Sequence, residues 1–265
     1  MAKTLREFKE IKADLYLLLL DSRAPESTFI DSFNDIIKDK KVVVVLTKSD
    51  LVEEGDLRHY INLYKDKYYY VKPITLDKPT KVKREIFQIL EEQKFRSLTP
   101  KIVILGAPNV GKSTLLNMIT GKNRAKAEDR PGVTKSNDWY QFKKKYWILD
   151  TPGVLQPKFV NEKQGVILAV IGSIKLDILP LEDIAVKLVD RLMWLGKIDD
   201  SIDPLSYIEN LIETTKKSGN AIYKKLIKNY QEGKYGKIIL DSIYDAPSST
   251  YEETLEVELS EKKIE

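Results

Sequence analysis

The sequence predicts an α/β domain with a mostly parallel sheet, followed by a smaller helical domain. Two observations predict the first domain: short apolar runs alternate with amphipathic helical stripes, and one such run leads into a glycine-containing loop that opens a helix. A third observation predicts the second domain, because beyond about residue 165 apolar residues recur only at helical spacing. We expect the first domain over residues 1–160, the helical domain over 165–245 and an acidic tail over 246–265.

Apolar patterning predicts the elements of the first domain in order. Buried strands are expected where apolar or β-branched residues run together, over 15–20, 42–46, 68–71 and 102–105. Helices are expected where apolar residues recur every three or four positions, over 4–12, 29–37, 56–66, 86–93 and after residue 114. A hairpin is expected from strands 139–142 and 146–149, with Lys143, Lys144 and Lys145 at its turn.

The second domain shows helical spacing throughout. Stripes of apolar residues predict helices over 166–171, 184–193, 205–212 and 222–227. A turn over 233–237 precedes a short apolar segment, 238–240, and residues 251–265 form a frayed acidic end.

Composition narrows the chemistry that this chain can perform. Its 265 residues include no Cys and a single His, which excludes disulfides, thiolate zinc sites and cysteine nucleophiles. His59 falls in a predicted helix and is interpreted as an exposed or packed helical residue. The net charge of +4 permits nucleic-acid binding only if the charges are segregated. No apolar run reaches the roughly 18 residues that span a bilayer. We therefore expect a cytoplasmic protein with no membrane partner.

The stretch Gly106-Ala-Pro-Asn-Val-Gly-Lys-Ser-Thr114 predicts a phosphate-binding loop, because it fits G-x-x-x-x-G-K-[ST] between a strand and a helix. Backbone N–H groups of such a loop converge on phosphate oxygens, and the helix dipole favours their charge. Lys112 would contact the β- and γ-phosphates, and the Ser113 hydroxyl would bind Mg²⁺. The expected phosphate contacts come from Asn109, Val110, Gly111, Lys112, Ser113 and Thr114. A glycine turn with a chance Lys-Ser is the alternative, which the flanking strand and helix disfavour.

Thr47-Lys48-Ser49-Asp50, at the end of a predicted strand, indicates that the base is guanine. The Asp50 carboxylate can accept hydrogen bonds from guanine N1–H and the exocyclic amine, a donor pair that adenine lacks. Lys48 would lay its aliphatic stem along the base, and Thr47 stands where Asn is commoner. Thr75, at the end of the next strand, is a candidate base contact. A solvated turn is the alternative for this tetrapeptide.

A third segment, Asp150-Thr151-Pro152-Gly153, follows the second strand of the predicted hairpin. Asp150 would hold Mg²⁺, and the Gly153 N–H would contact the γ-phosphate. Thr134, in the polar run before the hairpin, would join Ser113 as a Mg²⁺ ligand when triphosphate is bound. Lys112, Thr134 and Gly153 are the expected catalytic residues.

The order of these motifs resembles that of the circularly permuted GTPases, because the guanine motif precedes the phosphate loop. The resemblance is closest to the ribosome biogenesis GTPase A family. It rests on Asp21-Ser-Arg-Ala-Pro25 and the three motifs above, on Asp129-Arg-Pro-Gly-Val-Thr134, Pro157-Lys158-Phe159 and Lys234-Tyr-Gly-Lys237, and it covers nearly the whole chain.

This resemblance implies a circularly permuted P-loop GTPase that binds GTP and GDP with Mg²⁺ and assists late assembly of the large (50S) ribosomal subunit. The helical domain would grip ribosomal RNA, and no DNA partner is implied. Because permutation places the switch segments at the end of the GTPase domain, nucleotide state could set domain orientation.

Hydrolysis is expected to be slow without an activator. Val154 and Leu155 follow Gly153, where many GTPases place a Gln that orients the attacking water. The family often carries an N-terminal aromatic-Pro-Gly-His segment, and this chain opens at Met-Ala-Lys, where that segment would end. The chain either starts late or lacks the segment, so the ribosome is the expected activator.

Two further assignments stay open on the sequence. Asn109 resembles the Asn that holds K⁺ in potassium-dependent GTPases, or it is an ordinary loop residue. Lys216, Lys217, Lys224, Lys225 and Lys228, with Tyr223, Tyr230 and Tyr235 interleaved, suit RNA backbone contact with base stacking or a solvated helix face. The alternative functions are a GTP-gated binding module for another RNA or protein, and an ATPase with the same phosphate loop.

Overall fold

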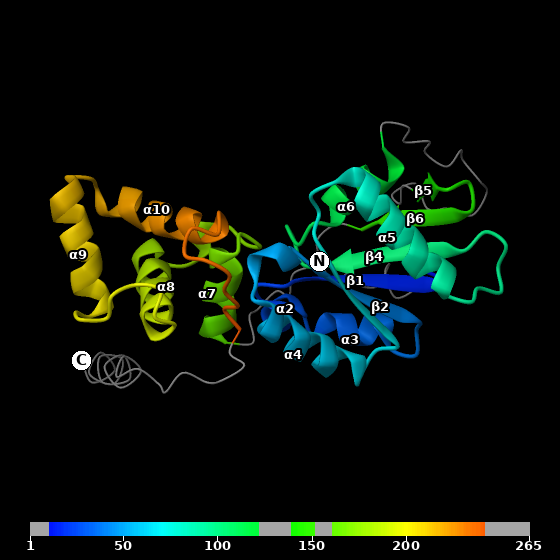
Figure 1. The fold of residues 1–265 in the computed structure, drawn as a ribbon, viewed down its shortest axis with the longest axis horizontal. Helices are drawn as coiled ribbons and strands as arrows, with labels where there is room; N and C mark the ends of the chain where they lie inside the picture. The colour runs from blue at the N-terminus through cyan, green and yellow to red at the C-terminus, as the bar shows by residue number, and fades with distance from the viewer. Residues whose placement is uncertain (1–10, 122–138, 152–160, 242–265) are drawn as a thin grey trace, which may run out of the picture.

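The computed structural model describes residues 11–121, 139–151 and 161–241. A sheet with its covering helices forms one half of the molecule, and a group of helices forms the other (Figure 1). The helix expected over 4–12, the acidic tail and the segments that contain Thr134 and Gly153 lie outside or largely outside the described residues. No helix in the described ranges is both long and apolar enough to cross a bilayer.

Six strands form one sheet in the order β3-β2-β1-β4-β6-β5. The strands are β1 (Leu15–Asp21), β2 (Val42–Thr47), β3 (Tyr70–Ile74), β4 (Lys101–Gly106), β5 (Trp139–Phe142) and β6 (Tyr146–Asp150). All neighbouring pairs are parallel except β5 and β6, which form the expected antiparallel hairpin. The α/β class and the mostly parallel sheet predicted from the sequence are confirmed.

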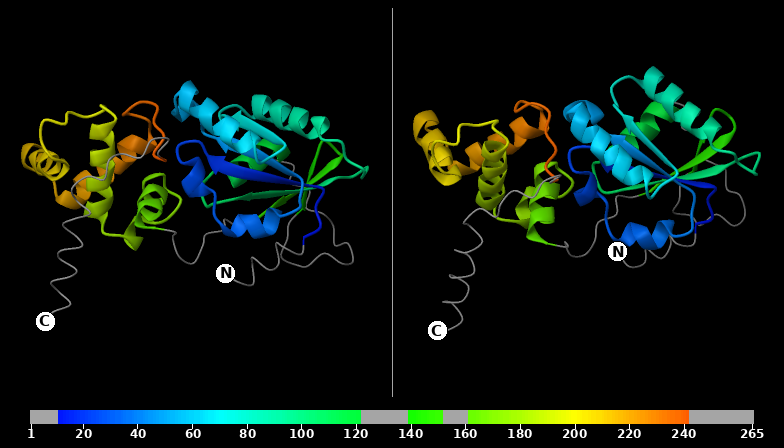
Figure 2. Two further views of the ribbon diagram at one scale, coloured as in Figure 1. Left: turned by 90° about the horizontal axis from the view of Figure 1, so that it is seen from below. Right: turned by 60° about the horizontal axis from the view of Figure 1, so that its bottom comes forward.

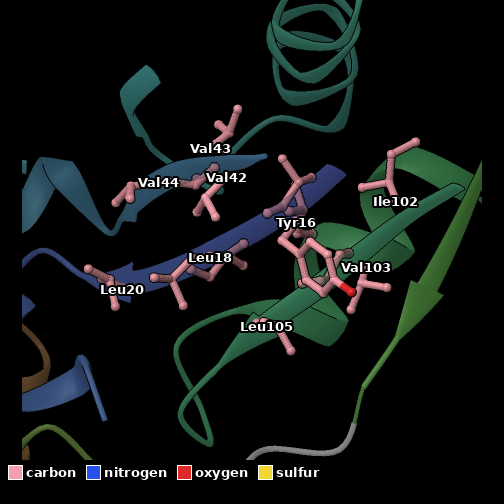
Figure 3. Close-up of a cluster of buried hydrophobic side chains, with 14 of the residues drawn as sticks. Tyr16, Leu18, Leu20, Val42, Val43, Val44, Ile102, Val103 and Leu105 are labelled. Atoms are coloured by element: carbon pink, nitrogen blue, oxygen red, sulfur yellow. The ribbon is translucent and has the colours of Figure 1, made fainter. Parts of the chain in front are cut away.

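The centre of the sheet is apolar on both faces, as expected for parallel strands covered by helices. Every residue of β1 and β2 is buried. Figure 3 shows side chains from β1, β2 and β4 stacked together, including Leu18, Val44 and Ile102. This continuous burial explains why these strands read as unbroken apolar runs in the sequence.

Five helices connect and cover the described strands. They are α2 (Pro25–Thr28), α3 (Ser32–Ile37), α4 (Glu54–Lys65), α5 (Pro79–Glu92) and α6 (Lys112–Thr120). The single helix expected over 29–37 was wrong in its start, because Phe29 is extended with φ −81° and ψ 97° and separates α2 from α3. Helix α5 contains the predicted apolar residues 86–90 and begins at Pro79, which suits the first helical turn because its missing N–H has no partner to lose there.

The third strand lies later than the sequence predicts, at Tyr70–Ile74 rather than 68–71. Tyr68 instead packs its ring beside those of Phe29 and Tyr64, at centroid distances of 6.3 and 6.2 Å. Pro73 is tolerated because β3 is an edge strand of the sheet, where a missing N–H breaks no ladder on the open side.

The other half consists of α7 (Glu162–Val170), α8 (Leu181–Trp194), α9 (Pro204–Thr215) and α10 (Gly219–Gln231). Helix α7 begins at Glu162, just before the expected boundary at residue 165, because the Asn161 side chain accepts a hydrogen bond from the Gln164 N–H at 2.8 Å. Buried side chains of α7, α8 and α10 share one core.

After α10 the chain returns to the first half of the molecule, as the orange end of the ribbon shows in Figure 2. The Ile238 N–H donates to Leu51 O at 3.1 Å, and the Leu240 N–H donates to Arg23 O at 2.7 Å. The Asp241 carboxylate then accepts hydrogen bonds from the Glu26 N–H at 2.6 Å, the Ser27 N–H at 3.1 Å and the Ser27 hydroxyl at 2.5 Å. These contacts fasten residues 238–241 onto the first half at three places: Leu51 after β2, Arg23 after β1, and the start of α2.

Burial dominates the titration of Asp241, which is 4% exposed. Desolvation raises the pKa of this carboxyl to about 6, although its hydrogen bonds from Ser27 and Glu26 oppose the rise. The folded protein therefore binds this proton more tightly than the unfolded chain does. The resulting stabilisation is complete below the ordinary pKa of 3.8 and is lost as pH rises through about 6.

We expect Asp241→Asn, which mimics the protonated acid, to gain stability relative to the natural protein as pH rises from 4 to 7. The gain should approach about 3 kcal/mol, since one pKa unit corresponds to about 1.4 kcal/mol. Urea unfolding of both proteins across this pH range measures the difference in free energy of unfolding. A difference that stays constant with pH, or that changes in the opposite direction, would contradict the assignment.

Candidate nucleotide-binding site

The carboxyl ends of four adjacent strands meet at one edge of the sheet. Strand register pairs Asp21 at the end of β1 with Thr47 at the end of β2, and it places Gly106 of β4 beside Leu19 of β1. On the other side of β4, Asp150 of β6 pairs with Ile104. Ligands in open parallel sheets bind at this edge, and the described residues of all three sequence motifs lie there.

The loop between β4 and α6 has the backbone that its glycines require. Gly106 has φ +155°, and a Cβ at this position would lie 2.6 Å from the Leu19 carbonyl oxygen. Gly111 has φ +106°, and Asn109 is left-handed with φ 59°. An L side chain at either glycine would force the loop away from β1 or from Leu76. The sequence GAPNVGKST therefore folds into the tight turn that the motif predicts.

Lys112 opens α6 and is buried at 6% exposure. Its ammonium donates to Gly106 O at 3.0 Å and to Ala107 O at 2.7 Å, so the side chain reaches back across the loop. The next residue, Ser113, lies in the first turn of α6 and is exposed. This places one ammonium and one hydroxyl within the same helical turn, beside the N–H groups that a helix leaves unpaired at its start.

The guanine motif is joined to the phosphate loop by two side chains. Thr47 is fully buried, and its hydroxyl lies 2.7 Å from Val110 O and 3.1 Å from Leu20 O. A hydroxyl donates one proton, so the shorter contact to Val110 is the stronger partner. Lys48 adds a second link, because its Nζ donates to Asn109 O at 3.1 Å. The end of β2, which leads into the turn that carries Asp50, is therefore held at a fixed distance from the loop.

Ser49-Asp50-Leu51 forms a short 3-10 turn, η1, which Lys48 enters in the left-handed conformation with φ 54°. Asp50 is exposed on this turn. The hydroxyls of Ser49 and Thr75 lie 3.1 Å apart, so Thr75 borders the guanine motif. Exposure leaves the Asp50 carboxylate accessible to a ligand at the strand ends.

The expected magnesium ligands are only partly described. Ser113 and the backbone of Asp150 lie at the ends of neighbouring elements, and the Thr151 hydroxyl anchors the segment after β6 by donating to Ile104 O at 2.5 Å. Thr134 and Gly153 lie outside the described residues. A hydroxyl and a carboxylate are hard oxygen donors, which fit the preference of Mg²⁺.

A buried ion cluster, for which the sequence predicts no role, lies beneath this edge. Arg23 binds the fully buried carboxylate of Asp21 through Nε at 2.9 Å and Nη2 at 2.8 Å, and Lys48 Nζ binds it at 2.7 Å. Burial raises the pKa of the Asp21 carboxyl, but the hydrogen bonds and charges of Arg23 and Lys48 outweigh burial and hold the pKa below its ordinary value. Burial also lowers the pKa of Lys48.

The same cluster reaches the helical half. Arg23 Nη2 donates to Ile171 O at 3.1 Å, and its guanidinium lies 5.8 Å from the centre of the Tyr230 ring. Beside it, the Asn109 amide donates through Nδ2 to Gly172 O at 2.6 Å. The phosphate loop, the guanine motif and the end of α7 are therefore connected through adjacent side chains.

The sequence offered only a partial signal for this cluster. Asp21 directly after a buried strand, with Arg23 two residues later, marks a charged pair at the site edge. Its partners Ile171, Gly172 and Tyr230 are distant in the chain, and backbone carbonyls carry no sequence signature.

Comparison with known proteins supports a GTPase. The family model described as 50S ribosome-binding GTPase matches residues 101–225, and the model described as RsgA GTPase matches residues 35–160. A protein named ribosome biogenesis GTPase A from Bacillus cereus is 37% identical over 198 residues, which cover 70% of this chain and 67% of that protein. The protein of the same name from Priestia megaterium is 36% identical over 199 residues, which cover 70% of this chain and 69% of that protein. An uncharacterised GTP-binding protein of Methanocaldococcus jannaschii is 31% identical over 84% of this chain and 63% of that protein.

Solved structures share the fold. The crystal structure of GNP-bound YlqF from T. maritima has a TM-score of 0.71 at 20% identity, with 92% of this chain and all of that chain covered. A GDP-bound structure of YlqF has a TM-score of 0.66 at 21% identity, with coverage of 88% and 96%.

We expect Thr47→Val to destabilise the protein and to weaken GDP binding, because the buried Val110 carbonyl loses its donor. The loss of free energy of unfolding should be about 1–3 kcal/mol. Thr47→Ser retains the hydroxyl and serves as the matched control. Urea unfolding measures the change in stability, and titration with fluorescent GDP measures the change in affinity. If the Val and Ser variants had the same stability and the same GDP affinity, the hydroxyl would not link the guanine motif to the phosphate loop.

Proposed function

This chain belongs to the ribosome biogenesis GTPase A family, and from that premise we propose that it assists a late step in assembly of the large (50S) ribosomal subunit. The chain is a GTP-binding GTPase with a role in ribosome biogenesis. We further propose that it acts on the large subunit through its RNA and in the cytoplasm. The proposed domains are the GTPase domain over 1–160, the helical domain predicted over 165–245, which starts with α7 at Glu162, and the acidic tail over 246–265. The acidic tail is assigned no role.

One observation carries the nucleotide assignment: Lys48 and Thr47 of the guanine motif bond directly to the carbonyls of Asn109 and Val110 in the phosphate loop. The base-reading turn and the phosphate-reading loop are thereby fixed to one another. A nucleotide whose phosphates follow Gly111 to Thr114 would present its base to Asp50, with Lys48 beneath the base and Thr75 at its border. This geometry favours guanine over adenine, because only guanine supplies two donors to one carboxylate.

We propose the following roles around the phosphates. Lys112 contacts the β- and γ-phosphates, and the Ser113 hydroxyl, Asp150 and Thr134 hold Mg²⁺. The Gly153 N–H contacts the γ-phosphate. Bound Mg²⁺ would neutralise charge that develops on the phosphate oxygens. Val154 and Leu155 offer no group that orients water, so intrinsic hydrolysis is slow and the ribosomal subunit stimulates it.

Asn109 is proposed as the ligand of a potassium ion. Its Nδ2 is engaged by Gly172, so the amide oxygen is the side-chain atom that remains to contact a cation. A monovalent cation there would offset negative charge in the transition state, as an arginine does in other GTPases.

The helical domain is proposed to contact ribosomal RNA through lysines. Lys216, Lys217, Lys224, Lys225 and Lys228 are all exposed. The stacking role considered for Tyr230 was wrong, because this ring is buried at 3% exposure against Arg23. Tyr223 and Tyr235 are only partly buried against the helical core, so they stay candidates for stacking beside the lysines.

We expect Asp50→Asn to weaken GTP binding by about 100-fold or more, because the amide cannot accept both guanine donors. Xanthosine triphosphate should gain affinity, since the amide can donate to its C2 carbonyl. Competition against a fluorescent nucleotide measures both, with Asp66→Asn, on an exposed residue after α4, as control. Unchanged preference for GTP would remove Asp50 from the base site.

We expect purified large ribosomal subunits to stimulate GTP hydrolysis in K⁺ and much less in Na⁺. Asn109→Gly keeps the left-handed backbone and removes the amide, so it should lose the K⁺ dependence. Hydrolysis of γ-labelled GTP with large subunits, small subunits or neither measures this. GTP binding without stimulation by large subunits would favour a GTP-gated binding module for another partner.

A further inference from the structure

A pocket lies between the turn of the β5–β6 hairpin and the end of α6. Its volume is about 430 Å³, and its lining comes from α5, α6 and the hairpin: Lys83, Ile119, Thr120, Gln141, Phe142, Lys143 and Lys144. Helix α6 starts at the phosphate loop with Lys112 and ends here at Thr120, and β6 starts here at Tyr146 and ends at Asp150. The pocket and the nucleotide site therefore lie at opposite ends of the same two elements.

The pocket lining is positively charged. Three of its residues are lysines and none is acidic. Lys83 reaches the end of α6, where a Cβ on Gly121 would lie 3.6 Å from its Nζ. The nearby carboxylate of Glu91 is paired with Lys145 at 2.8 Å and with the Tyr146 hydroxyl. Within the described part of the chain, no salt bridge neutralises Lys83, Lys143 or Lys144.

The other polar side chains of the pocket are already engaged. Thr120 donates its hydroxyl to Leu116 O at 2.6 Å, and Gln141 Nε2 donates to Lys144 O at 3.4 Å. The floor contributed by Ile119 and Phe142 is apolar and buried. Lys143 Nζ lies 5.2 Å from the centre of the Phe87 ring on α5, a contact that occupies none of its N–H donors. The three ammonium groups can therefore still donate to a ligand, and their charge favours an anion.

The hairpin turn places two of these lysines in a backbone conformation that lysine rarely adopts. Lys143 and Lys144 have φ 53° and 55°, and the Lys145 N–H closes the turn on Phe142 O at 3.2 Å. Two central residues with positive φ define the type I′ turn, where Asn-Gly is strongly preferred and lysine is strained. Strain retained at adjacent exposed positions points to a function for the side chains.

We propose that this lysine pocket, formed by Lys83, Lys143 and Lys144, binds the phosphodiester backbone of RNA. The proposal rests on the proposed role in ribosome assembly, and it adds to the helical domain a second RNA contact, on the GTPase domain itself. Adjacent ammonium groups without carboxylates suit successive backbone phosphates, which bind lysine through charge and without base specificity.

The variant Lys143→Asn/Lys144→Gly separates this role from a structural one. Asn-Gly relieves the strain of the turn, so the melting temperature should stay equal or rise. Binding to a fluorescein-labelled 20-base-pair RNA duplex, and to purified large ribosomal subunits, should weaken. The slope of log affinity against log salt concentration should fall in magnitude by about two, one for each lysine. Lys83→Gln should lower it by about one.

Lys38→Gln/Lys40→Gln is the matched control, because it removes two exposed lysines before β2, which β1, β4 and β6 separate from β5. Its salt slope should stay near that of the natural protein. If the Asn-Gly variant were more stable but kept the RNA affinity and salt slope of the natural protein, the pocket would not be an RNA-binding site. Equal losses in the control would also overturn the proposal, since binding would then follow net charge alone. If the natural protein binds duplex RNA through these lysines but does not bind subunits, the pocket stands and the assembly role fails.

Discussion

The buried carboxylate of Asp21 is the constraint on which the arrangement of this molecule depends. A fully buried charge is tolerated only when it is paired and hydrogen-bonded, and here Arg23 and Lys48 supply both. Lys48 belongs to the guanine motif and also holds the phosphate loop through Asn109 O. Arg23 holds the end of α7 through Ile171 O. One carboxylate thus fixes the base-reading turn, the phosphate loop and the helical half together.

Sheet geometry explains why the order of the motifs along the chain does not disturb the site. The carboxyl ends of parallel strands share one edge, whatever their order in sequence. The strand before the phosphate loop, β4, is fourth along the chain but lies centrally between β1 and β6. The guanine motif after β2 therefore precedes the phosphate loop in the chain and still lies beside it in the fold.

The sequence predicted much of the fold because its apolar runs are unusually clear. β1 and β2 are buried along their whole length, so their composition alone marks them as strands of a covered parallel sheet. The start of β3 and the helix over 29–37 were predicted wrongly. Tyr68 packs in an aromatic cluster instead of pairing in β3, and Phe29 is extended and separates two helices. The phosphate loop and guanine motif were visible as patterns of residue types. The joining contacts at Gly172 and Ile171 were not, because they are made by backbone carbonyls that any residue could supply.

The lysine clusters likewise differ in whether the sequence or only the fold reveals them. The lysines of α10 are recognisable in the sequence because they recur within one predicted helix, whereas Lys83 and the hairpin lysines come together only in the folded sheet. Composition gives only the net charge, whereas the fold shows that several of the lysines are gathered at one pocket.

The contacts of Arg23 and Asn109 join the nucleotide site and the helical half into one connected unit. The most direct test of this connection is the distance between spin labels at Arg58→Cys on α4 and Glu213→Cys on α9, exposed positions in a chain with no cysteine of its own. With GDP bound, we expect one narrow distance distribution, and a GTP analogue should shift its mean. A broad distribution in both states, or an identical one, would contradict the coupling.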